Sequence, residues 1–236
     1  MKAFHSIALA LVATAALSVS CLPNDEYLYS ETGMCTRIAR DKLLTDKGLT
    51  YYIVDNNSGS MIPDSVTRVM ISCDVMSKLE GRSDEYNIRL LDFMAAFTTD
   101  PLVAGTDEAE AAGHDGVSVT QAWVSGGYLN GYVTLALPNP ANEDHDINLV
   151  FDDVRSNTDT LFFEMRHNAH GECPENEDYA LPLFRFAGTY VSYPLEGLLP
   201  TGGKKPVVHL EWDWYDNDGS LILRTKSTHS GNVTVD

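Results

Sequence analysis

The sequence that decides the fold lies in the second half of the chain: VSVTQAWVSGGYLNGYVTLALP (117–138), DINLVFDD (146–153) and TLFFEMRHN (160–168). In these runs apolar residues alternate with small or polar ones, as in YLNGYV at 128–133. Alternation with a period of two, rich in Val, Thr, Tyr, Leu and Phe, is typical of half-buried antiparallel strands. Turn-forming pairs separate the runs, namely Gly126-Gly127, Asn139-Pro140 and Ser156-Asn157. The stretch therefore predicts a meander of antiparallel strands.

Other strand-like runs lie on both sides of this meander, at 51–54, 67–75 and 85–93 before it and at 179–193, 207–215 and 221–225 after it. The earlier runs predict a small β-barrel of about five short strands over 35–103. The later runs, together with the meander, predict a sandwich of two antiparallel sheets over 114–236. Asp218-Gly219 predicts a hairpin turn between the last two runs. The fold class is therefore all-β, with two domains.

Residues 100–116 (DPLVAGTDEAEAAGHDG) differ from their surroundings, because they are small, acidic and rich in glycine. This composition predicts an inter-domain connection or a long surface loop. Within it, TDEAEAAG predicts a short helix that Thr106 caps and Gly113 ends.

The N-terminus has the features of a secretory signal peptide over 1–20. Lys2 supplies a positive charge, and the apolar run 7–17 (IALALVATAAL) is shorter than the roughly 20 residues that span a bilayer. The run leads into Ser20-Cys21, which resembles the lipobox of bacterial lipoproteins, although Leu17 lies four residues before the cysteine instead of three. We therefore predict lipidation of Cys21, with two or three acyl chains holding the protein to the membrane. The alternative is an ordinary secreted protein that is cut nearby.

Residues 21–34 are predicted to form a tether, and Asp25-Glu26 within it resembles the surface-export signal of Bacteroidetes lipoproteins. The whole chain carries a net charge of −18, which becomes −19 without residues 1–20. Nucleic acid is excluded as a partner, because phosphate binding needs clustered Lys and Arg. Such an acidic protein can instead attract a basic peptide or protein.

After lipidation of Cys21, the remaining cysteines are Cys35, Cys73 and Cys173. Three is an odd number for an exported, oxidising compartment. A disulfide between Cys35 and Cys73 is one interpretation, and a buried thiol at Cys73, within the apolar run VMISCDV, is the other.

Several clusters have residue types that could support chemistry. HNAHGEC at 167–173 offers two histidines, a carboxylate and a thiol as zinc ligands, but we interpret it as a strand that ends in a loop. The acidic pairs Asp152-Asp153 and Asp144/Asp146 are expected by chance among 34 acids, and DNDG at 216–219 lacks the calcium-loop pattern. No nucleophile elbow or phosphate-binding loop is present. We therefore predict no catalytic residue, no metal and no cofactor, and a protein that is not an enzyme.

The chain has three tryptophans, Trp123, Trp212 and Trp214. Trp212 and Trp214 lie two apart on a predicted strand and so share one face. If that face is exposed, they form a candidate platform for sugar rings or a protein partner. If it faces the core, they are packing residues, which is the interpretation we favour. Trp123 is predicted to be a core residue.

The order and spacing of several segments resemble the NigD-like lipoproteins of Bacteroidetes over about residues 35–225. These segments are YYIVDNNSGSMIP, TRVMISCDV and SDEYNIRLLDF in the first half, and SVTQAWVSGGYLNGYVTLAL, DTLFFEMRHNAHGE and GTYVSYPLEGLL in the second. The chain departs from the family pattern at 65–68 (SVTR), where the Gly-Gln pair before the arginine is absent. The resemblance implies an N-terminal OB-like barrel, a C-terminal β-sandwich, an outer-membrane lipoprotein and a role in bacteriocin immunity.

We therefore expect a non-catalytic outer-membrane lipoprotein, on the periplasmic or the cell-surface side, that binds another macromolecule. A glycan-binding lipoprotein that uses Trp212 and Trp214, or a structural subunit of a surface assembly, are the alternatives. Capture by charge should weaken with salt, whereas stacking on sugars should hardly change.

Overall fold

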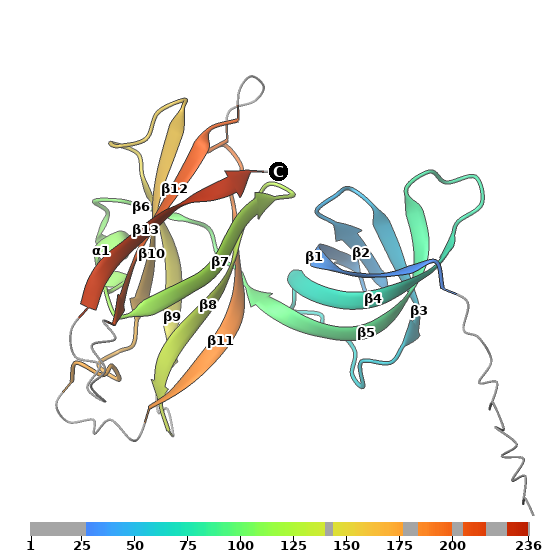
Figure 1. Cartoon of the computed structure of the whole chain (residues 1–236), viewed down its shortest axis with the longest axis horizontal. Coiled ribbons are helices and arrows are strands. Elements are labelled where there is room, and N and C mark those ends of the chain that lie inside the picture. The colour runs from blue at the N-terminus through green and yellow to red at the C-terminus, as the bar shows by residue number, and fades with distance from the viewer. Residues whose placement is uncertain (1–26, 140–143, 177–183, 200–204, 216–225, 236) are drawn as a thin grey trace, which may run out of the picture.

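The computed structural model describes residues 27–139, 144–176, 184–199, 205–215 and 226–235. In chain order the elements are β1 (Tyr29–Ala39), β2 (Lys42–Thr45), β3 (Thr50–Asn56), β4 (Arg68–Lys78), β5 (Glu85–Phe97), β6 (Leu102–Val103), α1 (Asp107–Ala111), β7 (Val117–Ser125), β8 (Tyr128–Pro138), β9 (Asp146–Asp152), β10 (Thr160–Asn168), β11 (Phe184–Pro194), β12 (Val207–Tyr215) and β13 (Lys226–Val235). A small unit of β1–β5 lies beside a larger unit that holds the other elements (Figure 1). The all-β fold class is confirmed.

The small unit is a closed barrel of five strands. Its strand order is β3-β2-β1-β4-β5, and β3 also pairs with β5 in parallel, which joins the two edges. Inward-facing residues fill the interior, among them Leu43, Val69 and Ile88, each fully buried. The predicted small barrel is therefore present. Its first strand begins at Tyr29, so the predicted tether over 21–34 extends six residues too far: β1 pairs with β4 from Tyr29 onward.

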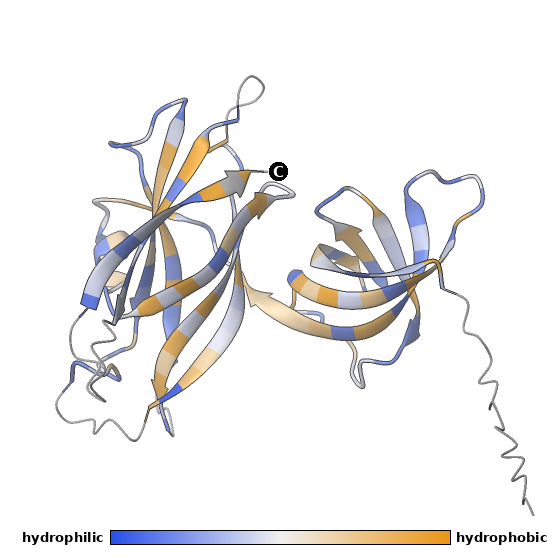
Figure 2. Ribbon diagram, viewed as in Figure 1, coloured by the Kyte–Doolittle hydropathy of each residue, from blue (hydrophilic) through white to orange (hydrophobic). Residues whose placement is uncertain are grey.

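The larger unit is a sandwich with two groups of paired strands. One group has the order β11-β8-β7, and the other has the order β13-β12-β10-β9-β6. In β10 the burial alternates at every residue, as the sequence TLFFEMRHN predicts, with Leu161, Phe163 and Met165 in the core. Figure 2 shows the same alternation of hydrophobic and hydrophilic residues along other strands of both units. The period-two pattern therefore determines which face each strand buries.

The long strand β5 connects the two units. It pairs with β4 in the barrel, and its last residues, Ala96 and Phe97, pair in parallel with Tyr190 and Val191 of β11 in the sandwich (Figure 1). Because one strand takes part in both sheets, the barrel and the sandwich share a continuous backbone hydrogen-bonded framework at this point.

Residues 100–116 belong to the sandwich, so the expectation that they form a connection between the domains is wrong. Strand β6 pairs in parallel with β9, and the Arg166 side chain donates to the carbonyl oxygen of Ala109 at 2.7 Å. The helix itself is as predicted, because the Thr106 side chain accepts from Ala109 N at its start and Gly113 follows it with a φ of +72°. The domain boundary therefore precedes β6, rather than lying between 103 and 114.

Some predictions fall outside the described residues, namely Cys21, the turn at 216–219 and the strand at 221–225. On either side of that turn, β12 and β13 pair antiparallel from Tyr215 and Lys226. Cys35, Cys73 and Cys173 are free thiols, and both barrel cysteines are buried. The predicted alternative of a buried thiol therefore holds for Cys73. None of the helices in the described ranges has the length and apolar character needed to span a membrane.

Candidate functional site

An arginine of the barrel lies at the centre of the contact between the two domains. Arg68 begins β4 and its side chain is only 1% exposed. Its guanidinium binds the carboxylate of Asp46, from the turn between β2 and β3, with Nη1 and Nη2 donating at 2.7 and 3.0 Å. A bidentate pair of this kind is among the strongest charge-assisted hydrogen-bond arrangements in proteins. The two hydrogen bonds therefore hold the Arg68 and Asp46 side chains in one relative orientation at this end of the barrel.

The same guanidinium also binds the sandwich. Its Nε donates to Ser192 Oγ and its Nη2 donates to Asn130 Oδ1, both at 2.9 Å. Nη1 makes a further hydrogen bond to Thr36 Oγ1 at 2.9 Å, so all five N–H donors of Arg68 have an acceptor. A buried charge is stable only when it is paired and fully hydrogen-bonded. We call this group the Arg68 network, with Arg68, Asp46, Asn130, Ser192 and Ser125 as its members.

Ser125 joins the network from the end of β7, because its Oγ donates to Asp46 Oδ2 at 2.7 Å. The next residue, Gly126, has a φ of +58°, and a Cβ placed there would lie 2.6 Å from Asp46 Oδ1. Glycine is therefore required at this turn both for its backbone conformation and for the close approach of Asp46. The Tyr128 ring covers the guanidinium, whose Cζ lies 4.0 Å from the ring centroid.

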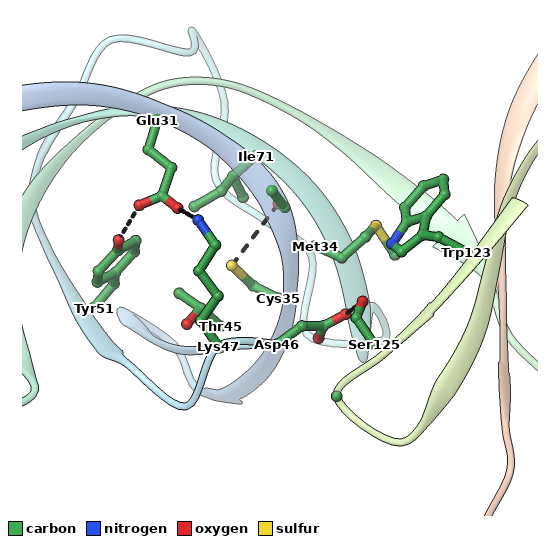
Figure 3. Close-up of a pocket in the computed structure, with 12 residues that line it drawn as sticks. Glu31, Met34, Cys35, Thr45, Asp46, Lys47, Tyr51, Ile71, Trp123 and Ser125 are labelled. Atoms are coloured by element: carbon green, nitrogen blue, oxygen red, sulfur yellow. Dashed lines mark hydrogen bonds and ion pairs between the residues drawn. The ribbon is translucent and has the colours of Figure 1, made fainter. Parts of the chain in front are cut away.

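Beside the Arg68 network lies a cavity of about 360 Å³, which we call the interdomain pocket. Its barrel side is formed by Glu31, Gly33, Met34, Cys35, Thr45, Asp46, Lys47, Tyr51 and Ile71, and its sandwich side by Trp123, Ser125 and Gly126. Figure 3 shows Met34 and Trp123 pointing toward each other from the two domains. Pockets of about 300 to 1,000 Å³ with a mainly apolar lining and a few polar groups are typical of binding sites.

Gly33 makes room for the pocket. It follows the alternation of β1 between Glu31 and Cys35, and in the barrel register it pairs with Ile71. A Cβ added at Gly33 would meet no atom within 4 Å. The missing side chain therefore leaves open space where neighbouring inward positions of the barrel are filled.

A charged group forms the polar end of the pocket. The Glu31 carboxylate accepts hydrogen bonds from the Tyr51 hydroxyl and from the Lys47 ammonium (Figure 3). Burial alone raises the pKa of Glu31, but these two hydrogen bonds and the charge of Lys47 outweigh it, so the pKa lies below its ordinary value. Burial and the nearby Glu31 raise the pKa of the Tyr51 hydroxyl. Glu31 is therefore an ionised acceptor and Tyr51 a neutral donor at neutral pH.

Among the tryptophans, Trp212 packs against the sandwich core, as the favoured interpretation predicts, whereas Trp123 does not lie in a core. Trp123 is only partly buried and lines the interdomain pocket, so its prediction as a core residue is wrong. The burial of β7 explains this, since Val124 points into the sandwich core and Trp123 to the opposite face. Trp212 packs against the sandwich core and stacks on His229, whereas Trp214 lies 6.1 Å from the ring of the exposed Phe186.

The histidines of HNAHGEC point to different partners. His167 is 1% exposed; its Nδ1 donates to the Gly116 carbonyl oxygen at 3.0 Å, and its Nε2 lies 2.8 Å from Nδ1 of His145. His170 binds Asp146 at 2.8 Å. Among the described residues, the group with metal-ligand spacing is instead Asp115, Cys173 and Glu175, whose ligand atoms lie within 4.8 Å of one another. Within it Glu175 already binds Lys226 at 2.8 Å.

The acidic pairs also have local partners. Asp152 Oδ1 accepts from the backbone N–H of Arg155 at 2.9 Å, which is a turn contact at the end of β9. No pattern in the sequence indicated Glu31 or Asp46 as site residues. Gly33, an isolated glycine within a strand, was the available signal, because such a position often marks a close approach or open space.

Comparison with known proteins agrees with this architecture. The model of the NigD-like C-terminal beta sandwich domain matches residues 101–224, which is more than half of the chain. The chain belongs to the NigD-like family. The match begins at the domain boundary found above, directly before β6. No protein among the curated ones matches.

Solved structures from species of Bacteroides share the fold of this NigD-like chain. A protein of unknown function from Bacteroides vulgatus has a TM-score of 0.61 and 20% identity, over 86% of this chain and 90% of that one. A NigD-like immunity protein from Bacteroides caccae has a TM-score of 0.59 and 21% identity, over 86% and 94%. A proposed lipoprotein from Bacteroides fragilis has a TM-score of 0.57 and 14% identity, over 86% and 97%. At such identities the likeness concerns the fold alone.

Proposed function

We propose that this protein is a non-catalytic, lipid-anchored binding protein of the outer membrane that captures a basic polypeptide at the interdomain pocket. The observation that carries the proposal is a preformed cavity of about 360 Å³ between two domains that the Arg68 network holds together. A rigid, preformed site binds with a smaller loss of conformational entropy than one that must be ordered first.

The ionisable groups of the pocket favour binding over catalysis. Burial raises the pKa of the Cys35 thiol far above its ordinary value, so the thiolate that a nucleophile requires is not formed at neutral pH. Both oxygens of Glu31 already accept a hydrogen bond, and Asp46 is neutralised by Arg68. The thiol is therefore unreactive, and the two carboxylates are already engaged in contacts within the protein.

The charge of the chain supports a basic partner. A net charge of −18 attracts cationic polypeptides over a distance and increases the rate of encounter. One structural neighbour is described as an immunity protein, and interception of a cationic bacteriocin is the form of the proposal that fits this description. The anchor at Cys21 would keep the protein at the membrane that such a toxin must cross.

A pull-down of the anchored protein from its own cells, washed at low and at physiological salt, tests the proposal. We expect a basic polypeptide that is retained at low salt and lost at higher salt, and that Trp123→Ala no longer retains. Trp212→Ala is the matched control, because Trp212 packs on the sandwich core, outside the pocket. Recovery of polysaccharide alone, insensitive to salt, would contradict the proposal.

A glycan-binding role is the second candidate, and the pair of Trp214 and Phe186 favours it. Phe186 is 59% exposed, and its ring lies 6.1 Å from that of Trp214. Exposed aromatic rings of this kind can stack on sugars. In the same experiment this role predicts polysaccharide that Trp214→Ala fails to retain and that Trp123→Ala still retains.

A further inference from the structure

Two different features of the protein would recognise a basic partner: the net charge of the whole chain and the apolar lining of the interdomain pocket. The pocket's own charges balance, because Lys47 pairs with Glu31 and Arg68 pairs with Asp46. The attraction for a basic partner therefore comes from the net charge of the whole chain rather than from the pocket. The pocket itself contributes apolar surface within a cavity of about 360 Å³.

The residues of the apolar part are suited to a flat ring. Trp123 presents a partly exposed indole from the sandwich, and Met34 points toward it from the barrel (Figure 3). Aromatic rings prefer offset or edge-on contact with an indole, and thioether sulfurs make favourable contacts with ring edges. The space left by Gly33 lies in the same pocket.

We infer that the interdomain pocket takes one aromatic side chain of the basic polypeptide, as an anchor between Trp123 and the space at Gly33. This inference rests on the proposed function. It adds which feature of the basic polypeptide the pocket selects, namely an aromatic side chain. Interface energy is concentrated in a few residues that fill desolvated pockets, and Trp and Tyr are the most frequent of them. Charge brings the partner to the protein, and the ring determines which segment of it is held.

Gly33→Val is the variant that tests the anchor. It fills the space within the pocket, and β-branched residues suit a strand. Thr32→Val on the same strand is the matched control, because Thr32 is exposed on the opposite face of β1. Unfolding midpoints of both variants establish that the fold is kept.

The probes are two labelled peptides of equal charge, Lys-Lys-Trp-Lys-Lys and Lys-Lys-Ala-Lys-Lys, titrated against the detergent-solubilised protein and followed by fluorescence anisotropy at low and physiological salt. We expect the Trp peptide to bind at least tenfold more tightly than the Ala peptide. The difference should persist in Thr32→Val and vanish in Gly33→Val. Raising the salt concentration should weaken the binding of both peptides by the same factor.

Each other outcome has a distinct meaning. Equal binding of the two peptides, weakened by salt, overturns the aromatic anchor and leaves capture by charge intact. A preference for the Trp peptide that survives in Gly33→Val also overturns the anchor, because the ring then binds elsewhere. If neither peptide binds at low salt, the anchor and the proposed function both fail.

Discussion

Arg68 in the barrel donates a hydrogen bond of 2.9 Å to Asn130 in the sandwich, across 62 residues of sequence. Asn130 Oδ1 also accepts from Ser192, so two strands of the sandwich are held by one barrel side chain. The position of one domain relative to the other therefore depends on the buried guanidinium of Arg68, whose five N–H groups all donate hydrogen bonds. The interdomain pocket lies beside this contact and takes part of its wall from Asp46 and Ser125.

Removal of the arginine should strongly destabilise the protein. In Arg68→Ala the Asp46 carboxylate, about 10% exposed, loses its cation, and breaking a buried pair costs about 3 to 5 kcal/mol. Urea unfolding of wild type and variant measures the difference in free energy of unfolding. Arg82→Ala is the control, because its pair with Glu85 is exposed and should leave stability nearly unchanged. A similar small effect for both variants would show that the Arg68 network does not hold the domains.

The two adjacent glycines of the turn between β7 and β8 should respond differently to alanine. Both have positive φ, so each substitution carries a conformational cost of about 1 to 2 kcal/mol. Only at Gly126 would the new Cβ also meet Asp46, whereas at Gly127 it meets nothing within 4 Å. Thermal unfolding should therefore show a lower Tm for Gly126→Ala than for Gly127→Ala. Equal Tm values would mean that Asp46 can move away freely.

His167 should make the protein less stable in mild acid. Burial, followed by the charge of His145, lowers the pKa of His167 to about 4, although the Gly116 carbonyl and the carboxylates of Asp115 and Glu175 act in the other direction. The unfolded chain, with a histidine pKa near 6.5, then binds more protons than the native state between pH 6.5 and 4. The contribution of His167 to the free energy of unfolding is fully present above pH 6.5. It is lost as the pH falls toward 4, and the loss is on the order of 3 kcal/mol.

Urea unfolding at several pH values, with wild type and His167→Gln, isolates this contribution. The slope between pH 6.5 and 4 should be shallower in His167→Gln, because the variant has no imidazole to protonate at this position. His229→Gln, at an exposed position of β13, should keep the wild-type slope. Parallel curves for wild type and His167→Gln would contradict the expectation.

The free thiols should be unreactive in the native state. Burial raises the pKa of Cys73 to about 12 and that of Cys173 to about 11, so neither forms an appreciable thiolate at pH 7. Iodoacetamide labelling, followed by mass spectrometry, should modify these cysteines slowly in the folded protein and fully in urea. Cys173, which is partly exposed, should be the first to react. Rapid labelling of Cys73 would indicate that the barrel opens.

The anchor predicted at Cys21 can be tested by fractionation. Cys21→Ala should move the protein from the membrane fraction to the soluble fraction if, as we predict, this single residue carries the acyl chains. Cys173→Ser removes a thiol elsewhere and should leave the protein in the membrane fraction. A membrane-bound Cys21→Ala protein would favour another mode of attachment.

Several features followed from the sequence because they depend on local patterns. The period-two alternation in 160–168 predicted which residues of β10 are buried, since a strand directs successive side chains to opposite faces. Thr106 and Gly113 predicted the limits of the short helix through capping chemistry and positive φ. The resemblance in residue order likewise predicted the NigD-like family, which the domain match confirms.

The site depended on contacts that no local pattern encodes. Arg68 meets Ser192 across 124 residues and Ser125 meets Asp46 across 79, and only the packing of barrel against sandwich brings these atoms together. For the same reason Trp123 was predicted as core: alternation assigns it to a face but does not reveal what that face meets. The sequence by itself determined the all-β class, most of the long strands with their alternating faces, and the family. The tertiary structure alone decided the pocket, because a cavity between two domains is formed by residues whose distance along the chain is unrelated to their distance in space.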